Sequence, residues 1–167
     1  MAHLLFFCYC VSKNVNGNTA VFTYDGTKLL IEQTDDTTKT NIYGTGLIAT
    51  AGNDVLYYQY NNHGDVISVL DQSGTVKNEY DGNAITEKET VSNPYRYAGY
   101  YQDSESGLYY LQSRYYNPRT ARFLTEDTAS GKYTDPLSLN KYTYCHNQPV
   151  TGYDPDGHAF NFITAAI

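Results

Sequence analysis

The sequence predicts an all-β fold made of antiparallel hairpins, and three observations support this. Charged residues make up 17% of the chain, against about 25% in an average domain. The 167 residues include 19 Tyr and 13 Gly; tyrosine favours pleated, half-buried surfaces and glycine favours turns. Short apolar stretches alternate with turn residues, and no sustained helical period of apolar positions occurs before residue 136. So many aromatic residues also argue against disorder.

A repeated pattern organises the first half of the chain. Tyr24, Tyr60 and Tyr80 are each followed by Asp or Asn, with Gly soon after and then an apolar stretch. Tyrosines at 24, 43, 60, 80, 97 and 116 are spaced by 19, 17, 20, 17 and 19 residues. Repeats of about 20 residues predict a stacked, curved or spiralling sheet in which each hairpin is buried only by its neighbours.

Each repeat has a direct physical interpretation. The Asp/Asn and Gly residues accommodate a tight turn, including positive φ where it is needed. We expect strands at 29–31, 46–49, 66–70 and from 74 to 80. The tyrosine ring is expected to lie across the adjacent hairpin while its hydroxyl meets water or a backbone group.

Residues 93–127 carry paired tyrosines between turn signals and predict a meander. We expect strands at 95–101, 108–116 and 122–124, with turns at 103–107 and 117–120. Further on, residues 135–141 predict a short helix or turn, with Asp135 as its cap and Pro136 at its first position.

Charge and cysteine content exclude some classes of function. With 11 Lys plus Arg against 18 Asp plus Glu, the net charge is −7, and no basic face is available for nucleic acid. Cys8, Cys10, Cys145 and the neighbouring His146 fit no common zinc spacing, so the cysteines are interpreted as buried small hydrophobes. We expect no metal and no cofactor. Motifs of serine hydrolases, P-loop proteins, dinucleotide-binding folds and zinc proteases are missing from the sequence.

The predicted organisation has four parts: an apolar segment at 1–14, repeat hairpins at 15–92, a core region at 93–158 and the start of an apolar extension at 159–167. The apolar start has neither the basic region nor the cleavage site of a secretory signal, and it is too short to span a bilayer. We expect the chain to be a C-terminal fragment of a longer protein; a buried first strand is the structural interpretation of the same residues.

The run NPYRYAGYYQDSESGLYYLQSRYYNPRTARF at 93–123 resembles the core motif of the RHS/YD-repeat family. The resemblance extends to residues 60–70, to LSLNKYTY at 137–144, to NQPV at 147–150 and to DPDG at 154–157. It implies a segment of a β-shell that encloses a C-terminal toxin in large secreted or surface proteins of bacteria. We therefore expect a structural shell segment that lacks the toxin itself and whose partners are the remainder of the shell and that toxin. Exposed strand edges should also cause self-association.

Two residues depart from the family pattern. The hairpin after Tyr80-Asp81 is shorter at Gly82-Asn83, and Ala121 stands where the family has Gly, which predicts strain in a turn that needs positive φ.

The resemblance also implies a first alternative function, self-cleavage by two aspartates. The family positions fall on Asp127 and Asp154, the cut falls at Gly157-His158, and Arg122 is the candidate supporting cation. Two carboxylates held close together share a proton and can activate water. The competing interpretation is that both aspartates are ordinary turn and surface residues. His158 also departs from the family pattern, since many cleaving members have Leu at this position.

A second alternative is a carbohydrate-binding module that uses Tyr109, Tyr110, Tyr115 and Tyr116 as a stacking platform. The competing interpretation is that these tyrosines form a packing layer between hairpins. His63 beside Asp65 resembles a catalytic pair, but a solvated turn histidine is the simpler expectation.

Overall fold

The computed structural model describes residues 9–81, 86–158 and 160–162. In these ranges the backbone forms strands, turns and short 3₁₀ segments, and every strand pair is antiparallel, as predicted. None of the helices in these ranges is long and apolar enough to cross a membrane. The first eight residues, including Cys8, and the short hairpin at Gly82-Asn83 lie outside the described residues.

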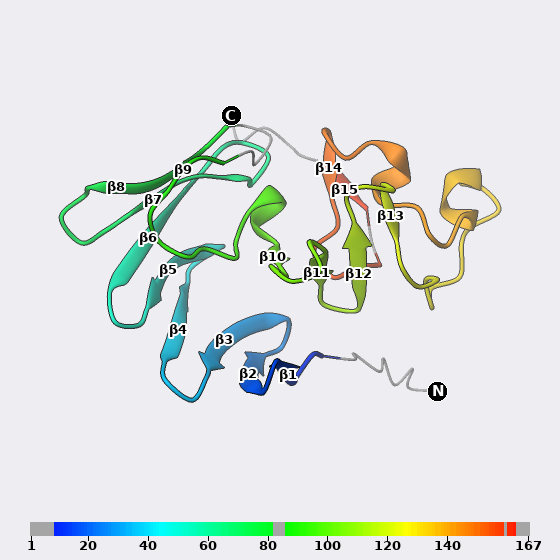
Figure 1. Ribbon diagram of the computed structural model, residues 1–167. Helices are drawn as coiled ribbons and strands as arrows, with labels where there is room; N and C mark the ends of the chain where they lie inside the picture. The colour runs from blue at the N-terminus through cyan, green and yellow to red at the C-terminus, as the bar shows by residue number, and fades with distance from the viewer. Residues whose placement is uncertain (1–8, 82–85, 159, 163–167) are drawn as a thin grey trace. The chain divides into compact units, whose positions relative to one another are not determined.

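The chain divides into two compact units (Figure 1). The repeat unit comprises residues 10–99, and the core unit comprises, among described residues, Tyr9 and residues 100–158 and 160–162. Each unit is described by itself below.

Nine strands form the single sheet of the repeat unit, and each strand pairs with the next along the chain. In Figure 1 they follow one another from blue at β1 to green at β9. The predicted strands at 29–31 and 66–70 are confirmed, and the one predicted at 46–49 begins at Leu47. The strands are β1 Ser12–Val15, β2 Asn18–Asp25, β3 Lys28–Gln33, β4 Thr38–Tyr43, β5 Leu47–Ala51, β6 Val55–Tyr60, β7 Val66–Leu70, β8 Val76–Tyr80 and β9 Thr86–Glu89.

An irregularity in register precedes the tyrosine in each of four successive hairpins. A β-bulge adds a residue to one strand and bends it, so the strand changes direction at the same point of every repeat. The shifts lie between Thr23 and Tyr24, Ile42 and Tyr43, Gln59 and Tyr60, and Glu79 and Tyr80.

Three repeat tyrosines donate a hydrogen bond to a backbone carbonyl 13 or 14 residues earlier in the chain, and we call this series the tyrosine ladder. Burial raises the pKa of Tyr43 and of Tyr60, so their hydroxyls remain protonated donors at neutral pH. The expectation that each hydroxyl meets a backbone group is confirmed for these residues. The bonds run from Tyr24 to Cys10 (3.1 Å), from Tyr43 to Leu29 (3.0 Å) and from Tyr60 to Leu47 (2.8 Å).

Tyr80 departs from this ladder because its hydroxyl accepts hydrogen bonds from two buried asparagines. Asn78 Nδ2 lies at 2.8 Å and Asn93 Nδ2 at 3.2 Å. Asn78 Oδ1 in turn accepts from the backbone N–H groups of Thr90 and Val91, at 2.8 and 3.1 Å. These bonds fix the segment 90–95, called the strap, against the sheet.

The turn that carries His63 is also fastened, to the end of the repeat unit. Asp65 is buried, and its Oδ1 accepts the Ala98 N–H at 2.7 Å and lies 2.7 Å from His63 Nδ1. The side chain of His63 is 12% exposed. The expectation of a solvated histidine is therefore wrong, because the segment around Ala98 covers this turn.

The core unit contains a four-stranded sheet, β10 to β13 in chain order, and a separate two-stranded sheet, β14 with β15. Its centre is aromatic: Tyr144 is 1% exposed, and its ring centroid lies 4.4 Å from that of Tyr116 and 5.8 Å from that of Phe123. The strands are β10 Tyr101–Gln102, β11 Tyr109–Leu111, β12 Arg114–Asn117, β13 Arg122–Phe123, β14 Gly152–Tyr153 and β15 Asn161–Phe162.

Two strands predicted for residues 93–127 are wrong. The strand expected at 108–116 is a hairpin, because Gln112 adopts a φ of 63° and the chain reverses so that Leu111 pairs with Arg114. Most of the strand expected at 95–101 is a bend around the 3₁₀ turn η1, Tyr97–Gly99, in which Ala98 has a φ of 48°.

The predicted turns and the predicted short helical segment agree better with the structure. The turn at 103–107 is closed by the Gly107 N–H, which donates to Asp103 O at 2.8 Å. Ala121 has a φ of 55°, so the positive φ predicted for this turn is confirmed, and an alanine in this conformation is expected to be strained. The 3₁₀ segment η2, Pro136–Leu139, begins at the predicted proline, although Asp135 makes no side-chain capping bond. A third such segment, η3, covers Cys145–Asn147.

Candidate functional site

Arg114, on β12 of the core unit, is the centre of a buried polar cluster. Its side chain is 4% exposed, and the guanidinium lies over the ring of Phe123, 3.6 Å from the ring centroid. Nη1 donates to Lys141 O at 2.9 Å, and Nε donates to Gly157 O. This one side chain thus joins β12 to two later loops.

The two aspartates of the self-cleavage hypothesis both lie beside this guanidinium. Arg114 Nη2 is 2.8 Å from Asp127 Oδ2 and 3.8 Å from Asp154 Oδ2, so only the first distance is a hydrogen bond. Burial lowers the pKa of Arg114, while Asp127 and Asp154 act in the opposite direction; an arginine nevertheless stays charged in a protein. Arg114 is therefore a cation that both carboxylates share.

The peptide bond between Gly157 and His158 lies within this cluster. Its carbonyl oxygen accepts from Arg114 Nε, and its N–H, on His158, donates to Asp154 Oδ1 at 3.0 Å. The imidazole Nδ1 of His158 is 2.6 Å from Asp127 Oδ1. Both sides of the predicted cut site are therefore held by the predicted aspartates and by Arg114.

Gly157 is required at this position by geometry. Its φ is 81°, and a Cβ built on it would lie 2.4 Å from Leu111 O and 2.5 Å from Ser113 Oγ. Its N–H donates to Asp154 Oδ1 at 2.8 Å. Any side chain here would push the turn out of the cluster.

The structure does not bring Arg122, the expected supporting cation, to the two aspartates. Arg122 is exposed, and in the part of the chain that the structure describes it forms no ion pair with Asp127 or Asp154. Arg114 occupies that position instead, because the chain reverses at Gln112 and turns Arg114 inward next to Leu111. A sequence signal was present, since Arg114 alternates with Tyr116 on one face of a tyrosine-rich strand.

The tyrosines proposed for carbohydrate stacking are divided between two environments. Tyr109 and Tyr116 are buried, at 7% and 5% exposure. Tyr110 and Tyr115 are half-buried, and their rings pack on each other with centroids 5.1 Å apart. The first pair packs the interior of the unit, so a stacking surface would depend on the second pair.

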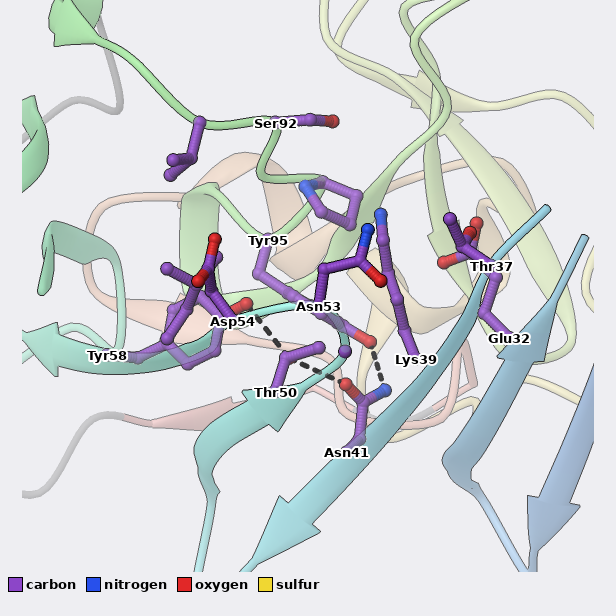
Figure 2. A pocket seen from close by; sticks show the side chains of 14 residues that line it. Glu32, Thr37, Lys39, Asn41, Thr50, Asn53, Asp54, Tyr58, Ser92 and Tyr95 are labelled. Carbon is purple, nitrogen blue, oxygen red and sulfur yellow. Dashed lines mark hydrogen bonds between the residues drawn. The ribbon is translucent and has the colours of Figure 1, made fainter. Parts of the chain in front are cut away.

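A pocket of about 280 Å³ lies on the face of the repeat-unit sheet beneath the strap. Figure 2 shows its floor, where Thr50 Oγ1 bonds to Asn41 Oδ1 (2.8 Å) and to the Tyr58 hydroxyl (2.9 Å), and Asn41 also donates to Tyr95. Lys39 and Asp54 line its walls. Because Asn41 belongs to the sheet and Tyr95 to the strap, this network holds the strap on the sheet.

The described cysteines, Cys10 and Cys145, form no disulfide. Cys145 is buried, in agreement with the predicted role as a small hydrophobe, and burial raises the pKa of its thiol to about 12. It is therefore a protonated, unreactive thiol at neutral pH.

Comparison with known proteins adds to this picture, although no protein-family model matches the chain. It is 43% identical over 162 residues to the tRNA3(Ser)-specific nuclease WapA of Bacillus spizizenii, which covers 89% of this chain and 7% of that protein. It is 32% identical over 111 residues to the toxin protein Tse5 of Pseudomonas aeruginosa, covering 62% of this chain and 8% of Tse5.

The fold is likewise similar to that of a solved structure, the crystal structure of TcdB2-TccC3. The TM-score is 0.64 at 26% sequence identity, over 87% of this chain and 8% of that one. The chain thus spans less than a tenth of the length of each of these three proteins. The repeats, the core motif and these similarities together assign the chain to the RHS/YD-repeat family, as an RHS-associated core region.

Proposed function

We propose that the chain is a structural wall segment of an RHS shell, and that the remaining wall and a C-terminal toxin belong to the same, much larger secreted or cell-surface protein. The observation that carries this proposal is the open sheet of the repeat unit. Its nine strands pair only with their neighbours in the chain, so β1 and β9 each keep one edge that no other described strand covers. Such edges are ready to pair with further strands of a wall.

A chimeric protein tests this proposal. The chain replaces its 43%-identical counterpart in Bacillus spizizenii WapA, and limited proteolysis then measures whether the full-length product resists digestion. A wall segment should give protection equal to that of the parent, whereas a chain of the same composition with its repeat hairpins scrambled should not. Digestion of both chimeras at the same rate would refute the proposal.

A second function, self-cleavage at Gly157-His158, is favoured by the geometry of that peptide bond. Arg114 Nε polarises the Gly157 carbonyl and would stabilise the negative charge that develops on its oxygen when water attacks. Asp154 lies against the departing nitrogen of His158. In the proposed step, Asp127 takes a proton from the attacking water and the hydroxide adds to the Gly157 carbon. Asp127 then returns this proton to the His158 nitrogen as the bond between Gly157 and His158 breaks, while the Asp154 carboxylate keeps that nitrogen in place.

Intact mass spectrometry tests the second function. Chain made by cell-free synthesis is quenched at intervals, and the loss of residues 158–167 is followed. Asp127→Asn and Asp154→Asn should each abolish the loss, whereas Asp135→Asn, at a more exposed aspartate of the core unit that pairs with His146, should retain it. A wild-type chain that keeps its full mass would eliminate this function and leave the wall segment unaffected.

Carbohydrate binding stays a prediction that rests on Tyr110 and Tyr115. The measurement that decides it is a glycan array probed with the wild-type chain and with a Tyr110→Ala, Tyr115→Ala double variant.

A further inference from the structure

The hydroxyl group of Tyr100 binds both ends of one residue, Asp154. It accepts the Asp154 N–H at 2.8 Å and donates to the Asp154 carbonyl oxygen at 3.0 Å. Tyr100 and Asp154 are 54 positions apart in the sequence and both belong to the core unit. No element of regular structure joins them, so this hydroxyl is a specific fastening point for the turn at 154–157.

The protonation and hydrogen bonding of this hydroxyl are well defined. Tyr100 is 9% exposed, and burial raises its pKa, so the group is neutral and both donates and accepts. Its single hydrogen points to the Asp154 carbonyl. The Tyr144 hydroxyl, 3.2 Å away, must therefore supply the hydrogen of the bond between the two tyrosines. With two bonds accepted and one donated, the oxygen has its full set of partners.

The position of the Asp154 carboxylate is set by the position of the Asp154 backbone. Asp154 Oδ1 accepts the N–H groups of Gly157 and His158, at 2.8 and 3.0 Å, and such bonds require the backbone of residues 154 and 157 to keep a fixed separation. The distance of 3.8 Å to Arg114 Nη2 is an ion pair but not a hydrogen bond. Arg114 therefore attracts this carboxylate without fixing its orientation as closely as the amide groups do.

We propose that Tyr100 is the positioning residue of the cleavage site: by binding the N–H and C=O of Asp154, it sets the direction in which that carboxylate faces the Gly157-His158 peptide bond. The catalytic meaning of this placement rests on the proposed self-cleavage. The placement itself does not, and it can be measured separately.

Amide hydrogen exchange in the purified chain, followed residue by residue by NMR, measures the placement. Tyr100→Phe keeps the ring and removes the hydroxyl. The amide hydrogens of Gly157 and His158, which do not touch Tyr100, should then exchange about tenfold faster. Tyr116→Phe is the matched control, because it removes another buried tyrosine hydroxyl that makes no described hydrogen bond to Asp154. Equal exchange rates at Gly157 and His158 in both variants would overturn the proposal.

The cleavage assay is the second arm. If the wild-type chain cuts itself, Tyr100→Phe should slow the loss of residues 158–167 about tenfold more than Tyr116→Phe does, when the two are compared at equal fractions folded. If the wild-type chain stays intact, self-cleavage fails as a function, and the exchange rates alone decide whether Tyr100 positions Asp154.

A third variant keeps the test valid if Tyr100→Phe does not fold. 4-Aminophenylalanine at position 100 retains N–H donors for the Asp154 carbonyl and one weaker acceptor lone pair for the Asp154 N–H. It should restore the fold and slow the exchange of the Gly157 amide. If the ring acted only by filling space, the added polar group would make no difference to that exchange rate.

Discussion

The repeat unit and the core unit reach stability in different ways. In the repeat unit every strand pairs with its sequence neighbour, and the tyrosine ladder joins groups 13 or 14 residues apart. In the core unit, Arg114 binds groups 27 and 43 residues away, and Tyr100 binds one 54 residues away. The repeat unit also contains long-range bonds, from Asn41 to Tyr95 and from Ala98 to Asp65, but they supplement a series of similar hairpins. The core unit depends on a few side chains that have no substitute. Variants of single residues should expose this difference.

The largest effect is expected at Arg114. Arg114→Met leaves the buried Asp154 and the half-buried Asp127 without their shared cation, and breaking a buried ion pair costs about 3–5 kcal/mol. Urea titration monitored at core-unit amides by NMR should report this loss. Arg122→Met, at an exposed site, should change stability by less than about 0.5 kcal/mol. Similar losses for the two variants would contradict the central role given to Arg114.

Two glycines with the same backbone conformation offer the next comparison. Gly157 and Gly74 have φ values of 81° and 80°, but only Gly157 has atoms within 4 Å of an added Cβ. Gly74→Ala should cost about 1 kcal/mol, from backbone strain alone. Gly157→Ala should cost roughly 3 kcal/mol, since steric overlap is added to the strain. Differential scanning calorimetry of both variants measures the difference, and equal shifts in Tm would show that the turn at 154–157 yields easily.

Removal of one bond from the tyrosine ladder should have a moderate effect. Tyr43→Phe and Tyr60→Phe each lose one hydrogen bond to a backbone carbonyl, worth about 1 kcal/mol. The losses of unfolding free energy should add in the double variant if the repeats are energetically independent. Tyr57→Phe, whose side chain is 43% exposed, is the control and should be nearly neutral. Chemical denaturation followed at repeat-unit amides decides the matter; a double variant much less stable than the sum would mean that the repeats act as one block.

Ala121→Gly should stabilise the core unit by roughly 0.5–1 kcal/mol, because glycine adopts the φ of 55° without the strain that alanine experiences. Ala129→Gly is the control, since Ala129 does not have a positive φ, and it should be neutral or slightly destabilising. An unchanged Tm for Ala121→Gly would mean that the turn strain is relieved elsewhere.

The smallest effect is a pH dependence from Asp65. Burial raises the pKa of Asp65, but the hydrogen bonds from His63, Ala98 and Asn61 outweigh it and hold the pKa below its ordinary value. The stabilisation from this carboxylate is therefore complete above its unfolded pKa of about 4, and it is lost as pH falls through the lower folded pKa. Thermal melts from pH 6 to pH 2 should show a steeper fall for wild type than for Asp65→Asn. Parallel curves would contradict this assignment.

The sequence predicted the hairpin pattern of the repeat unit because the information for a hairpin is local, but it did not predict the strap or the cover over His63. Tyr, then Asp or Asn, then Gly, then an apolar run marks each hairpin, and the strands at 29–31 and 66–70 were located correctly. In the core unit the paired tyrosines and turn signals predicted a meander, and the resemblance supplied the two aspartates and the Gly157-His158 site. The sequence did not predict the reversal at Gln112, since glutamine rarely adopts positive φ, and so it did not place Arg114 in the cluster. Contacts such as Tyr100 with Asp154 join distant residues, and no local pattern encodes them.

The tyrosine ladder has a direction, and this has an evolutionary consequence. Each hydroxyl bonds to a carbonyl that lies a nearly constant number of residues earlier in the chain. In a complete repeat inserted between two others, the tyrosine would therefore bond to the preceding repeat, and a backbone carbonyl would accept the bond from the following one. Duplication or deletion of whole repeats would leave every remaining bond of the series intact. Genes with such a pattern can lengthen or shorten the protein they encode in steps of one hairpin while the ladder is kept.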